Sequence, residues 1–174
     1  MAQTTTQATP QDTRLLTAGA PAAGTKLQDF TLKVATKDGV TDFKLSDHLG
    51  KGPIVFAFFP LAFTGTCTKE VCDFRDNLAP FSTLDAQVFG FSIDTPASNR
   101  AFATKENLPF GIISDPNRTF VGKVWPVMPN AIAAVERVAK RGAMVVDPDG
   151  TVKWAAASDD VGVWIGTEEV RKHL

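Results

Sequence analysis

The two cysteines of this 174-residue chain lie five residues apart, in the stretch FFPLAFTGTCTKEVCDFRD of residues 58–76. A thiol can act as a nucleophile, as a metal ligand or as half of a disulfide. A zinc site normally needs four ligands, and the two histidines, His48 and His173, lie far from the cysteines in sequence. The same lack of a nearby histidine argues against a Cys-His hydrolase. The pattern therefore favours thiol redox chemistry, although the C-x-x-x-x-C spacing differs from the C-x-x-C typical of thiol–disulfide oxidoreductases.

Cys67 is predicted to lie in the first turn of a helix that follows a buried strand. Residues 52–59 (GPIVFAFF) form a continuous apolar run, which is typical of a strand buried on both faces. Apolar or thiol residues then recur every three or four positions over residues 66–78, which predicts a helix. In open α/β sheets, sites form where strand carboxyl ends meet helix N-termini. A helix N-terminus also favours thiolate over thiol, so position alone makes Cys67 a candidate nucleophile.

The remaining chain alternates predicted strands with predicted helices. Residues 27–45 predict a β-hairpin around the turn Lys37-Asp38-Gly39. The segment 126–140 fits both a loop and two to three helical turns. The alternation predicts an α/β fold with a central mixed sheet flanked by helices. Further strands are expected at residues 87–94, 109–115, 141–147 and 151–157, and helices at 45–50, 96–107, 117–125 and 166–174, the last capped by Thr167.

Length and composition predict one domain, residues 25–174, after a flexible arm at residues 1–24. The arm is rich in Thr, Gln, Ala and Pro and lacks periodic apolar positions. A net charge of −1 with scattered basic residues gives no reason to expect a nucleic-acid partner. No apolar run approaches the ~20 residues of a membrane-spanning helix. The N-terminus does not read as a secretory signal, so we expect a cytoplasmic, reducing location.

Pro60, Thr64 and Cys67 have the spacing P-x-x-x-T-x-x-C, and here the sequence resembles the peroxiredoxin family. FPLAFTGTC is similar to the active-site loop of the AhpE-like branch, and CTKEVCDFRD to the bacterioferritin-comigratory-protein, or Q, branch. RGAMVVDPDG resembles the segment that carries the family's active-site arginine, here Arg141. The resemblance covers most of the chain from Leu27 onward. It implies a thioredoxin-like fold with an N-terminal β-hairpin, and a thiol-dependent peroxidase of hydrogen peroxide and organic hydroperoxides that uses no cofactor or metal.

The resemblance also implies a role for each of six residues. The transition state spreads negative charge over sulfur and both peroxide oxygens, so donors must already point there. By this resemblance, Cys67 attacks the peroxide, Thr64 hydrogen-bonds to the peroxide or the thiolate, and Pro60 shields the thiolate from water. Arg141 stabilises the charge and Glu70 orients that arginine. Cys72 resolves the oxidised thiol.

Four of these residues also have a plainer structural interpretation. Pro60 would simply end a strand, and Thr64 would cap a loop. Glu70 would be a first-turn acid that favours the helix dipole. Arg141 would be a solvated charge at a strand edge. The sequence alone leaves both interpretations open.

Cys72 has two interpretations that correspond to the two branches. On a helix it lies about 140° around and roughly 7.5 Å along from Cys67, so a disulfide requires the first turn to unwind. The Q-branch resemblance implies that Cys72 resolves Cys67 and that thioredoxin is the reductant. The AhpE-like resemblance implies a packing residue, with an external thiol or a glutaredoxin-like partner as resolver. The relatives differ in the same way in oligomeric state, and both a monomer and a homodimer remain open.

Overall fold

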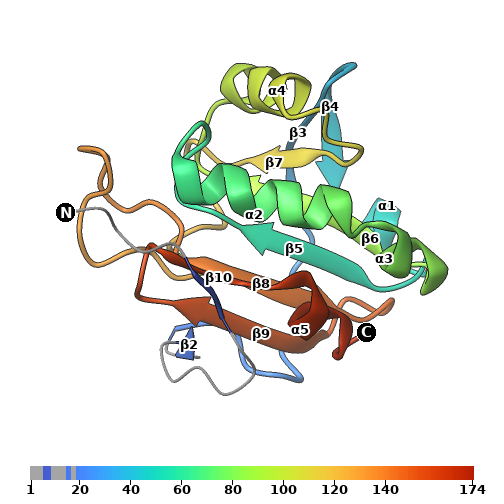
Figure 1. The fold of residues 1–174 in the computed structure, drawn as a ribbon. Helices are drawn as coiled ribbons and strands as arrows, with labels where there is room; N and C mark the ends of the chain where they lie inside the picture. Colours follow the sequence, from blue (N-terminus) through green and yellow to red (C-terminus); the bar gives the residue numbers. More distant parts are fainter. Residues whose placement is uncertain (1–5, 9–14, 17–18) are drawn as a thin grey trace.

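The computed structural model describes residues 6–8, 15–16 and 19–174 (Figure 1). Within these ranges the strands are β1 (Thr6–Ala8), β2 (Leu15–Leu16), β3 (Thr31–Thr36), β4 (Gly39–Lys44), β5 (Ile54–Phe58), β6 (Gln87–Ser92), β7 (Ile112–Ser114), β8 (Arg141–Val146), β9 (Val152–Ser158) and β10 (Val163–Ile165). The helices are α1 (Leu45–His48), α2 (Gly65–Asp76), α3 (Ala79–Thr83), α4 (Pro96–Lys105) and α5 (Thr167–Arg171).

The central sheet has the strand order β2-β9-β8-β5-β6-β7-β3-β4. Strands β5, β6 and β7 are parallel neighbours, whereas β8 pairs with β5 in the antiparallel direction. The hairpin β3–β4 joins the far edge through an antiparallel β3–β7 pair. The prediction of a mixed α/β sheet with an N-terminal hairpin is therefore confirmed. Strands β1 and β10 form a separate parallel pair.

Strand β5 is buried on both faces, as its continuous apolar sequence predicts. Because side chains alternate along a strand, Ile54, Phe56 and Phe58 face one core and Val55 and Ala57 face the other. The second core is shared with the buried faces of α2, α3 and α4, which Figure 1 shows on one side of the sheet. Each apolar residue of this strand thus packs in one of the two cores.

The opposite face of the sheet is covered by the segment of residues 116–140. Trp125 stacks on Phe58 with ring centroids 3.8 Å apart and planes 6° from parallel. This contact needs a glycine at position 142, because a Cβ there would lie 2.7 Å from the Trp125 ring and 2.2 Å from the Ala156 carbonyl oxygen. The segment is therefore fixed against the sheet beside the start of β8.

The predicted helix at residues 117–125 is wrong. The buried carboxylate of Asp115 accepts hydrogen bonds from the backbone N–H groups of Thr119, Phe120 and Val121. These bonds replace the helical ones, and Arg118 adopts a left-handed conformation with φ of 53°. The side chain of one aspartate thus organises a compact loop that periodicity does not reveal.

The segment of residues 126–140 is a loop that contains a two-residue hairpin. Ile132 and Val135 exchange two backbone hydrogen bonds of 2.9 Å each, and the two alanines between them form the turn. Thr167 does not cap the last helix as predicted. It is the first residue of α5, Gly166 occupies the capping position, and the Thr167 N–H donates to the Asp73 side chain at 3.3 Å.

Of the flexible arm predicted at residues 1–24, residues 1–5, 9–14 and 17–18 lie outside the described ranges. Residues 6–8 and 15–16 form strands β1 and β2, which pair with β10 and β9. Of the helices within the described ranges, none combines the length and the apolar character needed to cross a bilayer.

Candidate active site

Cys67 lies near the N-terminus of α2, directly after the loop that leaves the carboxyl end of β5. Thr64 occupies the N-cap position with extended backbone angles, so the helix begins at Gly65. The Cys67 side chain is 1% exposed and faces the sheet together with Glu70, Val71 and Phe74. The thiol therefore sits near the positive end of a three-turn helix, in a place largely closed to bulk water.

The guanidinium of Arg141 contacts the Cys67 thiol. Antiparallel pairing of β8 with β5 sets Gly142 opposite Phe58, so Arg141 lies just past the carboxyl end of β5. Side-chain alternation turns Arg141 toward the face that α2 covers, as it does Ala143. As a result, Nη2 of Arg141 lies 3.3 Å from Sγ of Cys67. Cys67 and Arg141 are 74 positions apart in the sequence, and they meet because of this strand register.

Glu70 fixes the orientation of Arg141. Its Oε2 accepts a hydrogen bond from Nη1 of Arg141 at 2.5 Å, and both side chains are only 1% exposed. Nε of Arg141 donates to the backbone oxygen of Val161 at 3.0 Å, so three guanidinium nitrogens have distinct partners. A planar guanidinium held at these points cannot rotate away from the thiol.

Burial dominates the acid–base behaviour of this ion pair. Loss of solvation raises the pKa of Glu70 to about 7, although the Arg141 charge opposes the shift. Burial also disfavours the Arg141 charge, but the Glu70 and Cys67 side chains outweigh it and raise the pKa of Arg141. The arginine therefore stays charged, and Glu70 changes charge near neutral pH.

This pKa predicts a pH-dependent difference in stability between the wild type and a Glu70→Gln variant. The pKa of Glu70 rises from 4.5 to about 7 on folding, so the folded state binds the proton more tightly between these values. The stabilisation is fully present below about pH 4.5 and is lost as pH rises toward 7, by up to about 3 kcal/mol. Urea unfolding of both proteins from pH 4 to 8 measures the difference. A difference that stays constant or grows with pH would contradict the assignment.

Pro60 and Thr64 shape the loop between β5 and α2. Pro60 is buried and has no N–H group, and the Thr64 hydroxyl donates to the Leu61 carbonyl oxygen at 2.8 Å. The loop is also held from outside, because the Ala62 N–H donates to the Asp94 carboxylate at 2.8 Å. Asp94 follows the carboxyl end of β6, which lies beside that of β5. This role of Asp94 was not predicted from the sequence, in which its position directly after a buried strand is the only signal.

A cavity of about 510 Å³ opens beside Arg141. Its charged lining residues are Lys69 and Arg141, both basic. Pro60, Thr64 and Val161 also line it, together with the turn of residues 131–133. The structure thus brings five of the six predicted residues to one place: Cys67, Glu70 and Arg141 in direct contact, and Pro60 and Thr64 around the adjoining cavity.

Cys72 has different neighbours from Cys67. Its side chain is half-buried, and Sγ lies 3.6 Å from Oε2 of Glu106 at the end of α4. Burial raises the pKa of the Cys72 thiol, the Glu106 carboxylate raises it further, and Arg75 opposes both. Both cysteines are free thiols, and they project from different sides of α2. In the reduced protein Cys72 is therefore kept as a thiol, away from Cys67.

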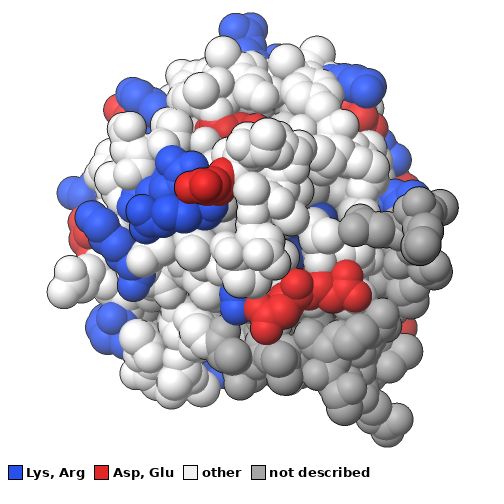
Figure 2. Space-filling view, turned by 90° about the vertical axis from the view of Figure 1, so that its left-hand side faces the viewer, with Lys and Arg blue, Asp and Glu red and all other residues white. Residues whose placement is uncertain are grey.

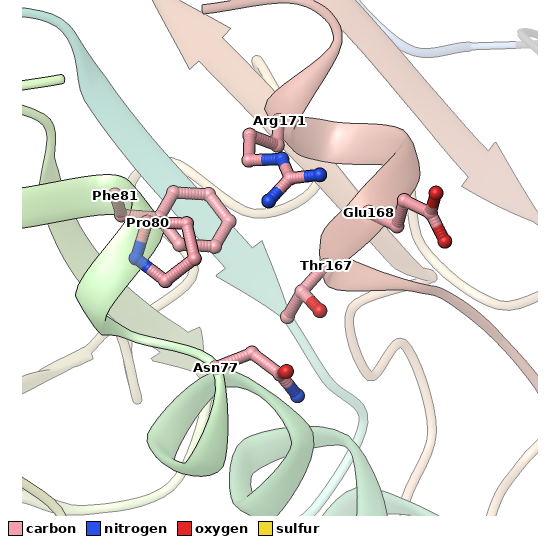
Figure 3. A pocket seen from close by; sticks show the side chains of 6 residues that line it. All are labelled: Asn77, Pro80, Phe81, Thr167, Glu168 and Arg171. Carbon is pink, nitrogen blue, oxygen red and sulfur yellow. The ribbon is translucent and has the colours of Figure 1, made fainter. Parts of the chain in front are cut away.

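A second, smaller cavity of about 160 Å³ lies at the other end of α2 (Figure 3). It is lined by Thr167, Glu168 and Arg171 of α5, by Pro80 and Phe81 of α3 and by Asn77, and neither cysteine lines it. Nowhere in the described ranges do three His, Cys, Asp or Glu side chains gather closely enough to hold a metal ion.

Comparisons with known proteins agree on one family. Residues 23–155 match the AhpC/TSA family. A putative peroxiredoxin of Mycobacterium tuberculosis is 37% identical over 135 residues, which cover 74% of this chain and 80% of the relative. The chloroplastic peroxiredoxin Q of Populus jackii is 39% identical over 124 residues, or 71% of this chain and 54% of the relative.

Solved structures give the same result. The peroxidoxin BcpB of M. tuberculosis superposes with a TM-score of 0.71 at 28% identity, covering 87% of this chain and 94% of that protein. The AhpC of Enterococcus faecalis superposes with a TM-score of 0.75 at 26% identity, covering 87% and 89%. The thioredoxin-like fold predicted from the sequence is therefore confirmed. The chain belongs to the AhpC/TSA family as a peroxiredoxin, a thiol-dependent peroxidase that reduces peroxides at the expense of a thiol reductant.

Proposed function

We propose that Cys67 is the peroxidatic thiol and that Arg141 and Glu70 form its electrostatic support. The observation that carries the proposal is the 3.3 Å contact between Nη2 of Arg141 and Sγ of Cys67, held in place by the Arg141–Glu70 ion pair. The Cys67 thiolate attacks one peroxide oxygen, the O–O bond breaks, and the other oxygen leaves with the electron pair and takes a proton. Cys67 becomes a sulfenic acid, and the peroxide becomes water or an alcohol. Arg141 stabilises the negative charge that spreads over sulfur and oxygen.

Pro60 and Thr64 complete this proposed site. Pro60 presents a ring without an N–H group, which limits the access of water to the thiolate. The Thr64 hydroxyl donates to Leu61 in the free protein, so it reaches a bound peroxide by exchanging that partner. A hydroxyl rotor can make this exchange without movement of the backbone.

Cys72 is proposed as the resolving thiol. After Cys67 is oxidised, the first turns of α2 unwind, the Cys72 thiolate attacks the Cys67 sulfur, and the sulfenic oxygen leaves as water. Unwinding also separates Cys72 from Glu106, and this removes one cause of its raised pKa. The alternative is a one-cysteine enzyme in which an external thiol attacks the sulfenic acid. A thiol–disulfide oxidoreductase is a weaker alternative, because its usual C-x-x-C spacing is absent.

One equivalent of hydrogen peroxide is expected to lower the mass of the wild-type protein by about two units, since a disulfide forms with loss of two hydrogens. Hydrogen exchange in α2 should accelerate in the same sample, because the intact helix keeps the two sulfurs apart. The Cys72→Ser control should instead stop at sulfenic acid and proceed to sulfinic acid in excess peroxide. A wild-type protein that also stops at sulfenic acid would assign resolution to an external thiol.

The reductant proposed for this disulfide is thioredoxin, and a glutaredoxin-like protein is its counterpart in the one-cysteine alternative. Two free thiols suit a reducing, cytoplasmic location. The functional unit is proposed to be a single peroxiredoxin domain of residues 25–174. Both a monomer and a homodimer are compatible with the two proposed steps.

A further inference from the structure

The C-terminal end of α4 contacts the segment of the two cysteines at two places. Directly before α2, the ring of Phe63 packs on the buried ring of Phe102, with centroids 5.1 Å apart. Further along α2, Sγ of Cys72 lies 3.6 Å from Oε2 of Glu106. The part of α2 that unwinds in the proposed resolving step therefore lies between two contacts with the same helix end.

Arg75 joins the same two helices through the backbone of Glu106. Its Nη1 donates to the Glu106 carbonyl oxygen at 2.7 Å, at a helix end where carbonyl groups have no partner within the helix. A positive charge is also favourable there. Because Arg75 is three residues after Cys72 on α2, it fixes the Glu106 backbone beside the turn that carries the thiol.

The carboxylate of Glu106 is placed differently from the charges at the surface. On the face shown in Figure 2, basic and acidic side chains stand at the surface in separate groups, with uncharged surface between them. The Glu106 side chain is only 14% exposed, and its other oxygen lies 3.9 Å from Nζ of the exposed Lys105. A carboxylate only accepts hydrogen bonds, so the Cys72 thiol must donate this one. A thiolate in the same place would face a like charge.

We propose that Glu106 is a positioning residue that holds Cys72 away from Cys67 and thereby sets how much of the oxidised Cys67 becomes a disulfide. The inference rests on the proposed function, with Cys72 as the resolving thiol. A Cys67 sulfenic acid has two fates. Attack by Cys72 forms the disulfide and releases water, whereas a second peroxide transfers an oxygen to the sulfur, gives sulfinic acid and leaves as water or an alcohol. The first fate requires the bond to Glu106 to break, and the second does not.

The Glu106→Ala variant is expected to form the disulfide about fivefold faster than the wild type, the scale of losing one hydrogen bond of ordinary strength. In a fixed excess of hydrogen peroxide, its ratio of disulfide to sulfinic acid should rise by the same factor. Both quantities are measured by rapid mixing with peroxide, acid quenching and intact mass. The rate of the first oxidation of Cys67 in the same samples is the internal reference, because a merely structural loss would change both steps.

Two further variants separate the contact from its charge. Glu106→Gln keeps an acceptor for the thiol but loses the charge, so its disulfide rate should lie between those of the wild type and Glu106→Ala. Glu168→Gln is the matched control, because it removes the same charge from an exposed position on α5. It should form the disulfide at the wild-type rate.

The reactivity of Cys72 in the reduced protein gives a second readout. In a Cys67→Ser background, Glu106→Gln should raise the rate of Cys72 alkylation by iodoacetamide several-fold, since the thiolate no longer faces a carboxylate. Unchanged disulfide formation in both Glu106 variants would overturn the inference, and so would slower formation, which would assign Glu106 as an acceptor of the thiol proton. A wild-type protein that forms no disulfide would overturn the proposed resolving role of Cys72 instead.

Discussion

In an Arg141→Ala variant, the oxidation of Cys67 by hydrogen peroxide is expected to be roughly a hundredfold or more slower than in the wild type, which is the scale of losing one transition-state donor. The guanidinium lies 3.3 Å from the sulfur and is held by Glu70 and the Val161 carbonyl group, so its charge and direction are fixed before the peroxide arrives. No other arginine contacts Cys67 within the described ranges. The rate of loss of alkylatable Cys67 after rapid mixing with peroxide measures the effect.

Arg75→Ala is the matched control for this experiment. Arg75 lies on the same helix as Cys67, but its guanidinium binds Asp76 and the Glu106 carbonyl oxygen. Its removal should change the rate of Cys67 oxidation no more than about twofold, since its charge is partly exposed and is already paired with Asp76. Arg141→Lys should remain slow, because one ammonium cannot reproduce three directed contacts. An Arg141→Ala rate within a few-fold of the wild type would remove the arginine from the proposed mechanism.

The part of the site that the sequence predicts is the part built from local pattern. The apolar run of β5, the three- to four-residue spacing in α2 and the P-x-x-x-T-x-x-C motif are all short-range features. They place Cys67 at a helix N-terminus, where the structure has it. The assignment of Arg141 came instead from the resemblance. The register that sets Gly142 opposite Phe58 is a long-range property, and no local sequence pattern predicts it.

The features that sequence reasoning missed depend on single side chains or on unusual backbone. The carboxylate of Asp115 accepts hydrogen bonds from backbone N–H groups that would otherwise form helical ones, so the helix predicted over residues 117–125 does not form. The hairpin turn at Ala133 and Ala134 lacks the glycine or asparagine that normally marks such a turn. Asp94 anchors the active-site loop through one backbone N–H group, a contact between residues 32 positions apart.

A Cys67→Ser variant is expected to lose thiol-dependent peroxide reduction roughly a thousandfold or more, because a serine hydroxyl cannot replace the attacking thiolate. Cys72 does not substitute for it, since burial and Glu106 raise the pKa of its thiol. The matched variant, Cys72→Ser, should keep the first oxidation step in a single turnover. Peroxide consumption with dithiothreitol as the only reductant measures the loss in Cys67→Ser.

The most direct measurement is the location of the first oxygen atom taken from the peroxide. The Cys72→Ser protein is treated with one equivalent of hydrogen peroxide, trapped with a sulfenic-acid reagent, and analysed by intact mass and peptide mapping. A single adduct on the peptide that contains Cys67 is expected, and the Cys67→Ser protein should carry none on Cys72. An unmodified Cys67 in the first protein, or a sulfenic acid on Cys72 formed equally fast in the second, would contradict the assignment of Cys67 as the peroxidatic thiol.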